Sequence, residues 1–253
     1  DLVVGDKDRI GAVLTPAEAG DVTFTSSDKS VVAVDDEGNV VAVGEGDAVI
    51  TVSFAGDDKY AAAEDKTISV TVSLKDASVS VENATLELLV DEDGSIVVVT
   101  TPEGLDVTYV PDDSGVVSVD EDGVVTALKE GTASIIVKVG GDGVYAENST
   151  VVTVTVSLND ASVVADDMAL NVGENGTISY TTTPDGLNVI FVVDDSGVVS
   201  VADDGTVTAL KEGNATIIVK VGGDGVYAEN STTVNVTVSL NDASVVADDM
   251  ALN

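Results

Sequence analysis

The chain contains one long segment twice, and its first copy is GTASIIVKVGGDGVYAENSTVVTVTVSLNDAS at residues 131–162. It returns with few changes as GNATIIVKVGGDGVYAENSTTVNVTVSLNDAS at 213–244, a period of 82 residues. Over the longer ranges 112–158 and 194–240, the two copies align without a gap and differ at 7 of 47 positions. A period of this length exceeds that of solenoid repeats and suits a whole small domain. The sequence therefore predicts a tandem array.

The phase of the repeats predicts the domain boundaries. We expect a first repeat at 1–74 that lacks its first strand, complete repeats at 75–157 and 158–240, and the first strand of a further repeat at 241–253. The last expectation depends on ASVVADDMALN, which occurs at 161–171 and again at 243–253. Two interpretations stay open. Either the chain was cut from a longer array, or the trailing segment is a donor strand that completes the first repeat of another subunit.

The composition indicates an all-β protein and argues against catalysis. Val, Thr, Ser, Gly and Asp dominate, with four prolines and no tryptophan. The apolar runs are too short to span a bilayer, so no membrane insertion is expected in this segment. No cysteine is present for disulfides, and no histidine for proton transfer or metal binding. We therefore predict no enzyme activity, no catalytic residues, no cofactor-binding residues and no metal ligands of the transition-metal kind.

The charge of the chain excludes some partners. There are 46 acidic residues against 10 basic ones, a net charge of −36 that is spread over all repeats. Nucleic acid and anionic lipid would be repelled by such a surface. The charge indicates solubility, with a calcium-binding or halophilic role as the alternative.

Strand patterns in the third repeat predict a sandwich. Short apolar or alternating segments follow one another, each bounded by Gly, Asp or Pro. The expected strands are 161–172 (one strand, with a possible kink at Asp166-Asp167), 176–183, 187–193, 198–201, 206–210, 215–221 and 232–240. Seven short antiparallel strands without a helix are typical of a β-sandwich.

Three details of this pattern can be compared with a structure. Val234, Val236 and Val238 alternate with polar residues, which predicts one buried face and a solvent-facing Asn235. The range 215–221 is apolar at nearly every position, which suggests a central strand covered on both faces or packed near a domain junction. Asp-Gly pairs at 122–123 and 204–205 favour tight hairpins.

These residues carry a resemblance to a known family. The segment TFTSSDKSVVAVDDEGNVVAVGEGDAVITVSFAGDDKYAAAEDKTISVTVS at 23–73 has a serine and aspartate turn, a valine strand, an Asp-Gly or similar hairpin, a Gly-Glu-Gly turn and a final alternating strand. DDSGVVSVDEDGVVTALKEGTASIIV at 112–137 keeps these parts. The chain resembles bacterial immunoglobulin-like domains of group 2 (Big_2). That resemblance implies tandem sandwiches in an elongated rod, as in adhesin-like cell-surface proteins of bacteria and archaea.

Six of the twelve asparagines lie in Asn-x-Ser/Thr sequons, which are acceptors for N-glycosylation in exported proteins. The alternative is that a Thr-rich chain forms sequons without using them. The candidates are Asn83, Asn148, Asn175, Asn214, Asn230 and Asn235.

Other motifs favour structural roles. Acidic clusters such as Asp120-Glu121-Asp122 could hold structural calcium at a junction, but they lack the ligand spacing of an EF-hand, so solvated turns are the simpler interpretation. Gly140-Gly141-Asp142-Gly143 and its copy at 222–225 have no following helix, and a loop between the last two strands is expected. The tyrosine after each loop (Tyr60, Tyr145, Tyr227) would pack as a core or corner plug. Lys138 and Lys220 could form isopeptide bonds or be exposed strand lysines.

The sequence thus predicts a non-enzymatic stalk segment of a large extracellular, cell-surface protein. Its partners would be further copies of the repeat, in cis or in trans, and a surface receptor bound through domains outside these residues. The alternative is a subunit of a self-assembling filament or surface layer joined by donor-strand complementation. A carbohydrate-binding module is less favoured because aromatic residues make up 3% of the chain. A hydrolase is least favoured.

Overall fold

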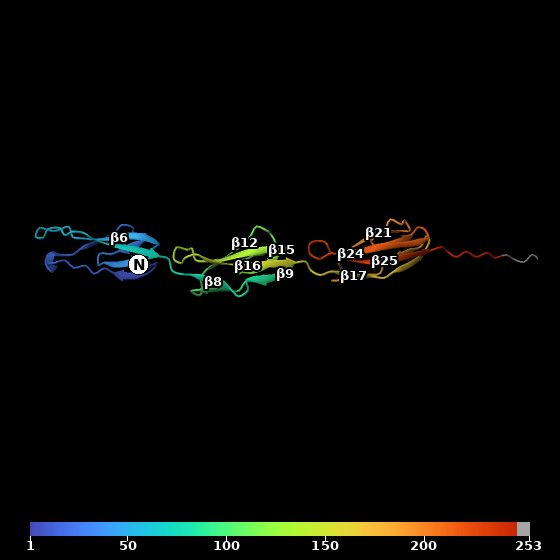
Figure 1. The fold of residues 1–253 in the computed structure, drawn as a ribbon, viewed down its shortest axis with the longest axis horizontal. Coiled ribbons are helices and arrows are strands. Elements are labelled where there is room, and N and C mark those ends of the chain that lie inside the picture. The colour runs from blue at the N-terminus through green and yellow to red at the C-terminus, as the bar shows by residue number, and fades with distance from the viewer. Residues whose placement is uncertain (247–253) are drawn as a thin grey trace, which may run out of the picture.

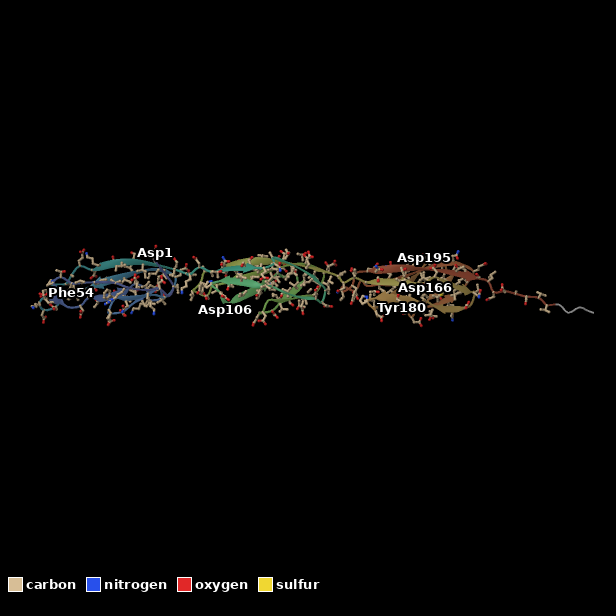
Figure 2. The ribbon with its side chains drawn as sticks, turned by 90° about the horizontal axis from the view of Figure 1, so that it is seen from below. Asp1, Phe54, Asp106, Asp166, Tyr180 and Asp195 are labelled. Atoms are coloured by element: carbon tan, nitrogen blue, oxygen red, sulfur yellow. The ribbon has the colours of Figure 1, made fainter. Side chains whose placement is uncertain are left out.

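The computed structural model describes residues 1–246, and these form three β-domains in a row (Figure 1). The fold is all-β, as expected, with one short 3-10 helix at Ala17–Ala19. Among the described residues, no helix is long and apolar enough to cross a membrane. Acidic side chains such as Asp106, Asp166 and Asp195 lie on the outer surface of the row (Figure 2).

The second repeat shows the complete sandwich. Its four-stranded sheet has the order β12-β15-β16-β9, and it faces a three-stranded sheet β10-β14-β13 and a two-stranded sheet β11-β8. All pairs are antiparallel except β9 with β16, which are parallel. The strands are β8 (Ser78–Val81), β9 (Thr85–Leu89), β10 (Asp93–Ser95), β11 (Val98–Thr101), β12 (Val107–Pro111), β13 (Val117–Val119), β14 (Val124–Ala127), β15 (Gly131–Val139) and β16 (Asn148–Ser157).

The third repeat has the same topology, with sheets β21-β24-β25-β18, β19-β23-β22 and β17-β20. Its strands are β17 (Ser162–Ala165), β18 (Met168–Asn171), β19 (Asn175–Thr177), β20 (Tyr180–Thr183), β21 (Val189–Val193), β22 (Val199–Val201), β23 (Thr206–Ala209), β24 (Gly213–Val221) and β25 (Asn230–Ser239).

The first repeat lacks the two-stranded sheet. Its sheets are β3-β6-β7-β1 and β2-β5-β4. Its strands are β1 (Leu2–Val3), β2 (Lys7–Arg9), β3 (Thr23–Ser26), β4 (Val32–Val34), β5 (Asn39–Ala42), β6 (Gly46–Ser53) and β7 (Lys66–Ser73).

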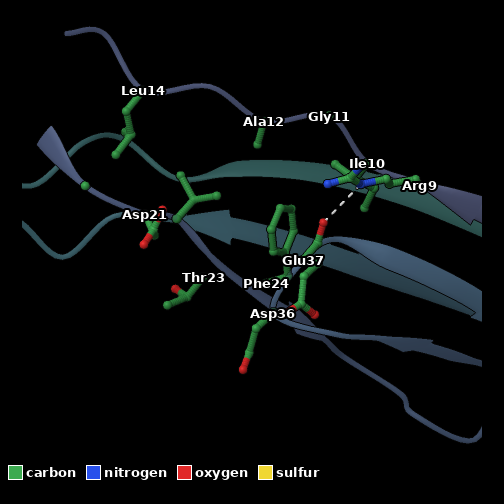
Figure 3. A pocket seen from close by; sticks show the side chains of 12 residues that line it. Arg9, Ile10, Gly11, Ala12, Leu14, Asp21, Thr23, Phe24, Asp36 and Glu37 are labelled. Carbon is green, nitrogen blue, oxygen red and sulfur yellow. Dashed lines mark hydrogen bonds between the residues drawn. The ribbon is translucent and has the colours of Figure 1, made fainter. Parts of the chain in front are cut away.

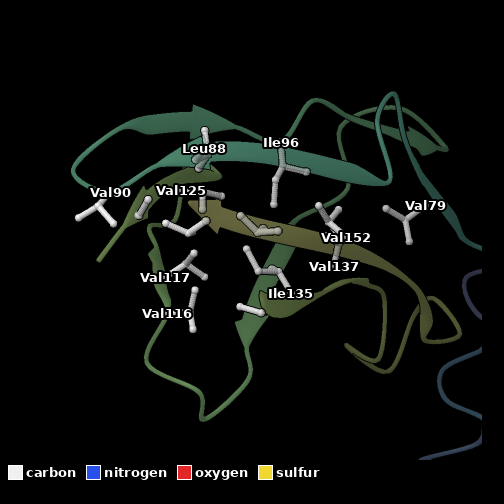
Figure 4. Packing of buried hydrophobic residues seen from close by; sticks show 14 of the residues in the cluster. Val79, Leu88, Val90, Ile96, Val116, Val117, Val125, Ile135, Val137 and Val152 are labelled. Carbon is white, nitrogen blue, oxygen red and sulfur yellow. The ribbon is translucent and has the colours of Figure 1, made fainter. Parts of the chain in front are cut away.

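Each repeat has its own apolar core, in which Ile and Val from the two layers pack together. In the second repeat, Leu88, Ile96, Val125, Ile135 and Val152 meet between the sheets (Figure 4). No polar side chain among the described residues is buried. The predicted boundaries, after residues 74, 157 and 240, stay predictions; the second coincides with the end of β16, and the other two lie one residue after the ends of β7 and β25.

Two predicted strands each divide into two. The range 161–172 is interrupted at Asp166-Asp167, and β17 pairs with β20 in one sheet while β18 pairs with β25 in another. The range 176–183 likewise splits into β19 and β20, which belong to different sheets. The prediction of single strands here was wrong because the chain moves from one sheet to another within each range.

The strand at 215–221 also differs from its prediction. The enclosing β24 is central in its sheet, but only alternate residues are covered: Ile217 and Val219 are 0% exposed, whereas Ile218 is 37% exposed. The outer face of the sheet is therefore open, and coverage on both faces was a wrong expectation. Asn235 is exposed, as predicted.

The Asp-Gly hairpins are confirmed. β13 and β14 pair through Val119 and Val125, and β22 and β23 pair in the same register through Val201 and Val207. Gly123 closes the first hairpin at φ 79°, where a residue with a side chain would be strained. The Asp120 N–H also donates to the Val124 carbonyl at 3.0 Å, so the loop proper is the three residues 121–123 and ends in a left-handed glycine.

The predicted first strand of a further repeat, 241–253, lies partly outside the described residues. Its described part, 241–246, is in no strand, and Val245 is 96% exposed.

Candidate functional site: the junctions between repeats

The junction between the second and third repeats is built around Asn159, which follows β16 by two residues. Its backbone N–H donates to the Val226 carbonyl at 2.9 Å, and its own carbonyl accepts the Ala228 N–H at 2.9 Å. Its side-chain amide donates to the Val90 carbonyl at 3.0 Å and to the Val226 carbonyl at 3.3 Å. Because Val90 belongs to the second repeat and Val226 to the third, one side chain bridges the two domains.

Apolar contacts reinforce this bridge. Leu158 of the linker and Val226 of the third repeat both pack against the core of the second repeat. Removing such side chains from water stabilises the contact, and a linker that is hydrogen-bonded on both sides has little freedom to bend. The junction is therefore a packed interface and not a free tether.

The partner loop, 222–229, is itself held rigid. The Asp224 carboxylate accepts the N–H groups of Val226 at 3.0 Å and Tyr227 at 2.8 Å. These hydrogen bonds, first from Tyr227 and then from Val226, lower the pKa of Asp224. Gly222 has φ 71°, and a Cβ there would meet the backbone of Ala228. The motif is thus a loop between β24 and β25, as predicted, and Tyr227 packs on the core of the third repeat.

The junction between the first and second repeats has the same backbone contacts but a different side chain. Lys75 takes the place of Asn159, and its N–H donates to the Val144 carbonyl at 2.9 Å. Its ammonium lies over Gly5 and 5.9 Å from the centre of the Tyr145 ring. Val144 is 36% exposed. A lysine ammonium therefore stands at this junction where the second junction has the Asn159 amide.

After the third repeat, the same amide contact recurs. Asn241 donates from Nδ2 to the Val172 carbonyl at 3.0 Å, where Val172 occupies the position of Val90. Asn241 therefore contacts the end of the third repeat in the same way as Asn159 contacts the end of the second.

The six predicted glycosylation sites fall into two groups. Five are exposed: Asn83, Asn175, Asn214, Asn230 and Asn235. Asn148 is half-buried, and its Oδ1 accepts the Val79 N–H at 3.2 Å, which ties β8 to β16. Asn235 is also engaged, since its Nδ2 donates to Asp167 at 3.1 Å. The candidates that are exposed and are not engaged in these two hydrogen bonds are therefore Asn83, Asn175, Asn214 and Asn230.

The lysines considered for isopeptide bonds lie at the surface. Lys138 pairs with Glu147 at 3.4 Å, and Lys220 pairs with Glu229 at 3.3 Å; the two lysine side chains are 37% and 36% exposed. Both therefore occupy the positions of exposed strand lysines.

The acidic clusters lie in turns. In residues 1–246, no group of three or more acidic side chains could hold a metal ion. Asp112 instead accepts the backbone N–H groups of Ser114 at 3.0 Å and Ser134 at 2.7 Å, so it connects a turn to β15. Structural calcium stays a prediction.

The first repeat also contains a cavity that no motif in the sequence indicated. It has a volume of about 790 Å³ and is lined by Ile10, Ala12, Leu14 and Phe24 among others (Figure 3). At its edge, the Arg9 Nε donates to the Glu37 carbonyl at 3.3 Å.

All three repeats match one family of domains. The family model of the bacterial Ig-like domain (group 2) matches residues 2–62, 76–151 and 158–232. An uncharacterized protein of Clostridium acetobutylicum is 30% identical over 193 residues, which are 74% of this chain and 19% of that protein. The chain thus spans about a fifth of the length of this relative.

Similar solved structures are also multidomain. Drosophila N-cadherin EC1-4 has 15% identity and a TM-score of 0.32, with 88% of this chain and 66% of that one covered. Domains 1-6 of the surface layer protein SbsC have 18% identity and a TM-score of 0.31, with 88% and 35% covered. Scores at this level place no constraint on function.

Proposed function

The chain belongs to the bacterial Ig-like domain (group 2) family, and from this premise we propose that it is a non-enzymatic stalk segment of a larger extracellular protein. The stalk holds a receptor-binding region, located outside these residues, away from the cell envelope. A row of small domains joined by short, hydrogen-bonded linkers keeps its two ends further apart than a flexible chain of the same number of residues does.

The observation that carries this proposal is the Asn159 bridge. A linker hydrogen-bonded to Val90 on one side and to Val226 on the other fixes the angle between two sandwiches. The acidic surface supports the same role, because a net charge of −36 disfavours collapse of the row onto itself. Exposed sequons support an exported location.

Small-angle scattering tests the stalk. We expect the wild-type chain to scatter as a rod, and Asn159→Ala to broaden its distance distribution because the amide bridge between repeats is lost. Asn241→Ala is the matched control: it removes the same amide contact, to Val172, beyond the last described repeat. A compact wild-type profile, or equal effects of the two substitutions, would contradict the proposal.

A second candidate function is that of a subunit in a filament joined by strand addition. The recurrence of the β17 sequence at 243–253 favours it, because an identical segment can pair with a repeat of another copy.

A further inference from the structure

The third repeat has an apolar strand at one edge of its larger sheet. This strand, β21, is the end member of the sheet β21-β24-β25-β18 and pairs with β24 (Figure 1). Its outward-facing side chains, Ile190 and Val192, are 55% and 43% exposed. Ile218 of β24, which lies opposite Val192, is also exposed, at 37%. An edge strand that is apolar and carries no charge is a place where a further strand can add.

The free edge of β21 offers backbone groups as well as apolar side chains. The Asp194 N–H donates to the Thr216 carbonyl at 3.0 Å, toward β24. Successive residues of an antiparallel strand direct their N–H and C=O groups to opposite sides, so those of Val189, Phe191 and Val193 point away from β24. No other strand of residues 1–246 pairs with this edge. Three residues of β21 can therefore hydrogen-bond to an added strand.

The equivalent edges of the other two repeats are protected. β12 of the second repeat has Pro111 at the place in the ladder where β21 has Val193. Proline lacks an N–H, so this position of β12 cannot donate to an added strand. The outward residues of β3 in the first repeat are Thr23 and Thr25, which are polar. The third repeat has neither device, and its edge differs from the others in the features that permit strand addition.

The sequence of β21 is nearly the same when it is read in either direction. From Val189 to Val193 it is VIFVV. In an antiparallel pair of two such strands centred on Phe191, Val189 of one copy lies opposite Val193 of the other. Ile190 then lies opposite Val192, so apolar side chains meet across the pair. The outward backbone groups also face each other in this register, which allows about six hydrogen bonds.

The charges beside β21 favour the same arrangement. With Phe191 at the centre, Asp194 of one copy lies opposite Asn188 of the other, and Asp195 lies opposite Leu187. No two carboxylates are directly opposed. A parallel pair in register would place Asp194 beside Asp194, and like charges directly opposite each other destabilise a sheet. The charge pattern therefore selects the antiparallel pair.

We propose that β21 binds β21 of a second copy of this chain, as an antiparallel pair centred on Phe191. The contact uses the same surface of both copies, so it closes at a dimer and joins two sheets into one. The inference goes beyond the stalk, because it gives two stalks a lateral contact at their third repeats. Each copy carries a charge of −36, so salt that screens the repulsion should strengthen the pairing.

Cysteine cross-linking of the full chain tests both the pairing and its register, since the chain has no cysteine of its own. In the proposed pair, positions 190 and 192 of different copies are opposed without hydrogen bonds, and their Cα atoms lie about 4.5 Å apart, within the reach of a disulfide. A mixture of Ile190→Cys and Val192→Cys should therefore form disulfide-linked dimers at least roughly tenfold faster than either variant alone. Equal rates would indicate random collisions, and faster reaction of the single variants would indicate a parallel pair. Either result would overturn the proposal.

The second repeat supplies the matched control. Thr108→Cys and Val110→Cys occupy the same two positions on β12, beside Pro111. Their mixture should cross-link no faster than the single variants do. If it reacted as fast as the β21 mixture, the contact would not depend on the unprotected edge, and the proposal would fail.

A proline in β21 then tests the hydrogen bonds of the pair. Val193→Pro, added to both cysteine variants of β21, removes one outward N–H and should lower the cross-linking rate of the mixture to that of the single variants. Thermal unfolding checks that the third repeat stays folded, as the second repeat does with Pro111. A folded Val193→Pro mixture that reacted at the original rate would contradict pairing through this edge.

Sedimentation equilibrium of the chain without introduced cysteines tests the size of the assembly. We expect monomers and dimers, with the dimer fraction rising with protein concentration and with salt. Species that continue to grow beyond the dimer would contradict the closed contact. A chain that stayed monomeric at the concentrations and salt used for cross-linking would overturn the pairing itself.

Discussion

Single aspartates connect distant parts of each repeat. The pKa of Asp112 is lowered from 3.8, first by hydrogen bonding from the Ser114 hydroxyl and then by that from the Ser134 N–H. A lowered pKa stabilises the fold above the unfolded-state value, and this contribution is lost as the pH falls through the folded-state pKa. We expect Asp112→Asn to lower the melting temperature of the second repeat at pH 7, and the difference from wild type to shrink as the pH falls below 3.8.

Asp113→Asn controls for charge, because it removes the same charge from an exposed neighbour that makes no side-chain hydrogen bond among the described residues. Differential scanning calorimetry across pH compares the two variants. If they melted alike at pH 7, the connection from Asp112 to Ser134 would not contribute to stability.

The sequence found all six sequons but could not rank them. Asn148 accepts a hydrogen bond from Val79, which is 69 residues away, so no local pattern could show that its side chain is in use. Asn235 was correctly placed on the solvent side because strand alternation is a local property, visible in its neighbours Val234 and Val236. Strand alternation therefore predicted which way an asparagine side chain points. Only the folded structure shows whether that side chain is already hydrogen-bonded.

Among the elements, β8 closes the core of the second repeat and β17 that of the third. We expect Val163→Ala in β17 to destabilise the third repeat by about 2 kcal/mol, because buried methyl groups are lost from a side chain 5% exposed. Val164→Ala, at a position 64% exposed, should change stability little. Hydrogen exchange measured for each repeat in the full chain resolves the effect, since the three cores are separate. Equal protection in both variants would show that β17 is not part of the cooperative unit.

The sequence predicted where strands form, but not which sheet each strand joins. The range 161–172 reads as one alternating segment, yet its two halves pair with β20 and β25. An alternation of two residues tells which side of a strand is buried and gives no information on the neighbouring strand. For the same reason, the apolar run at 215–221 suggested two covered faces, whereas Ile218 faces solvent.

At the scale of the whole molecule, repetition predicted the array and the resemblance predicted the sandwich. The bridge by Asn159 could not be foreseen, because it depends on how Val90 and Val226, 136 residues apart, meet at one linker. The same comparison of repeats shows that the two junctions are not equal, since Lys75 stands where the second junction has asparagine.

This difference predicts that the row bends more easily between the first and second repeats. Val4 occupies the position of Val90, and its N–H bonds to Ser73 at 3.0 Å as that of Val90 bonds to Ser157 at 3.0 Å. We therefore expect Lys75→Asn to place an amide within reach of the Val4 carbonyl and to stiffen the first junction. Each such hydrogen bond contributes about 1 kcal/mol, which is enough to shift the population between bent and straight arrangements roughly fivefold.

Distances between spin labels on adjacent repeats measure this stiffening. The chain has no cysteine, so two introduced cysteines carry the labels without side reactions. The distance distribution across the first junction should narrow in Lys75→Asn, and the distribution across the second should broaden in Asn159→Lys. If the wild-type junctions gave equal widths, the amide bridge would not control stiffness, and the rigidity of the stalk would have to come from the apolar contacts of Leu158 and Val226.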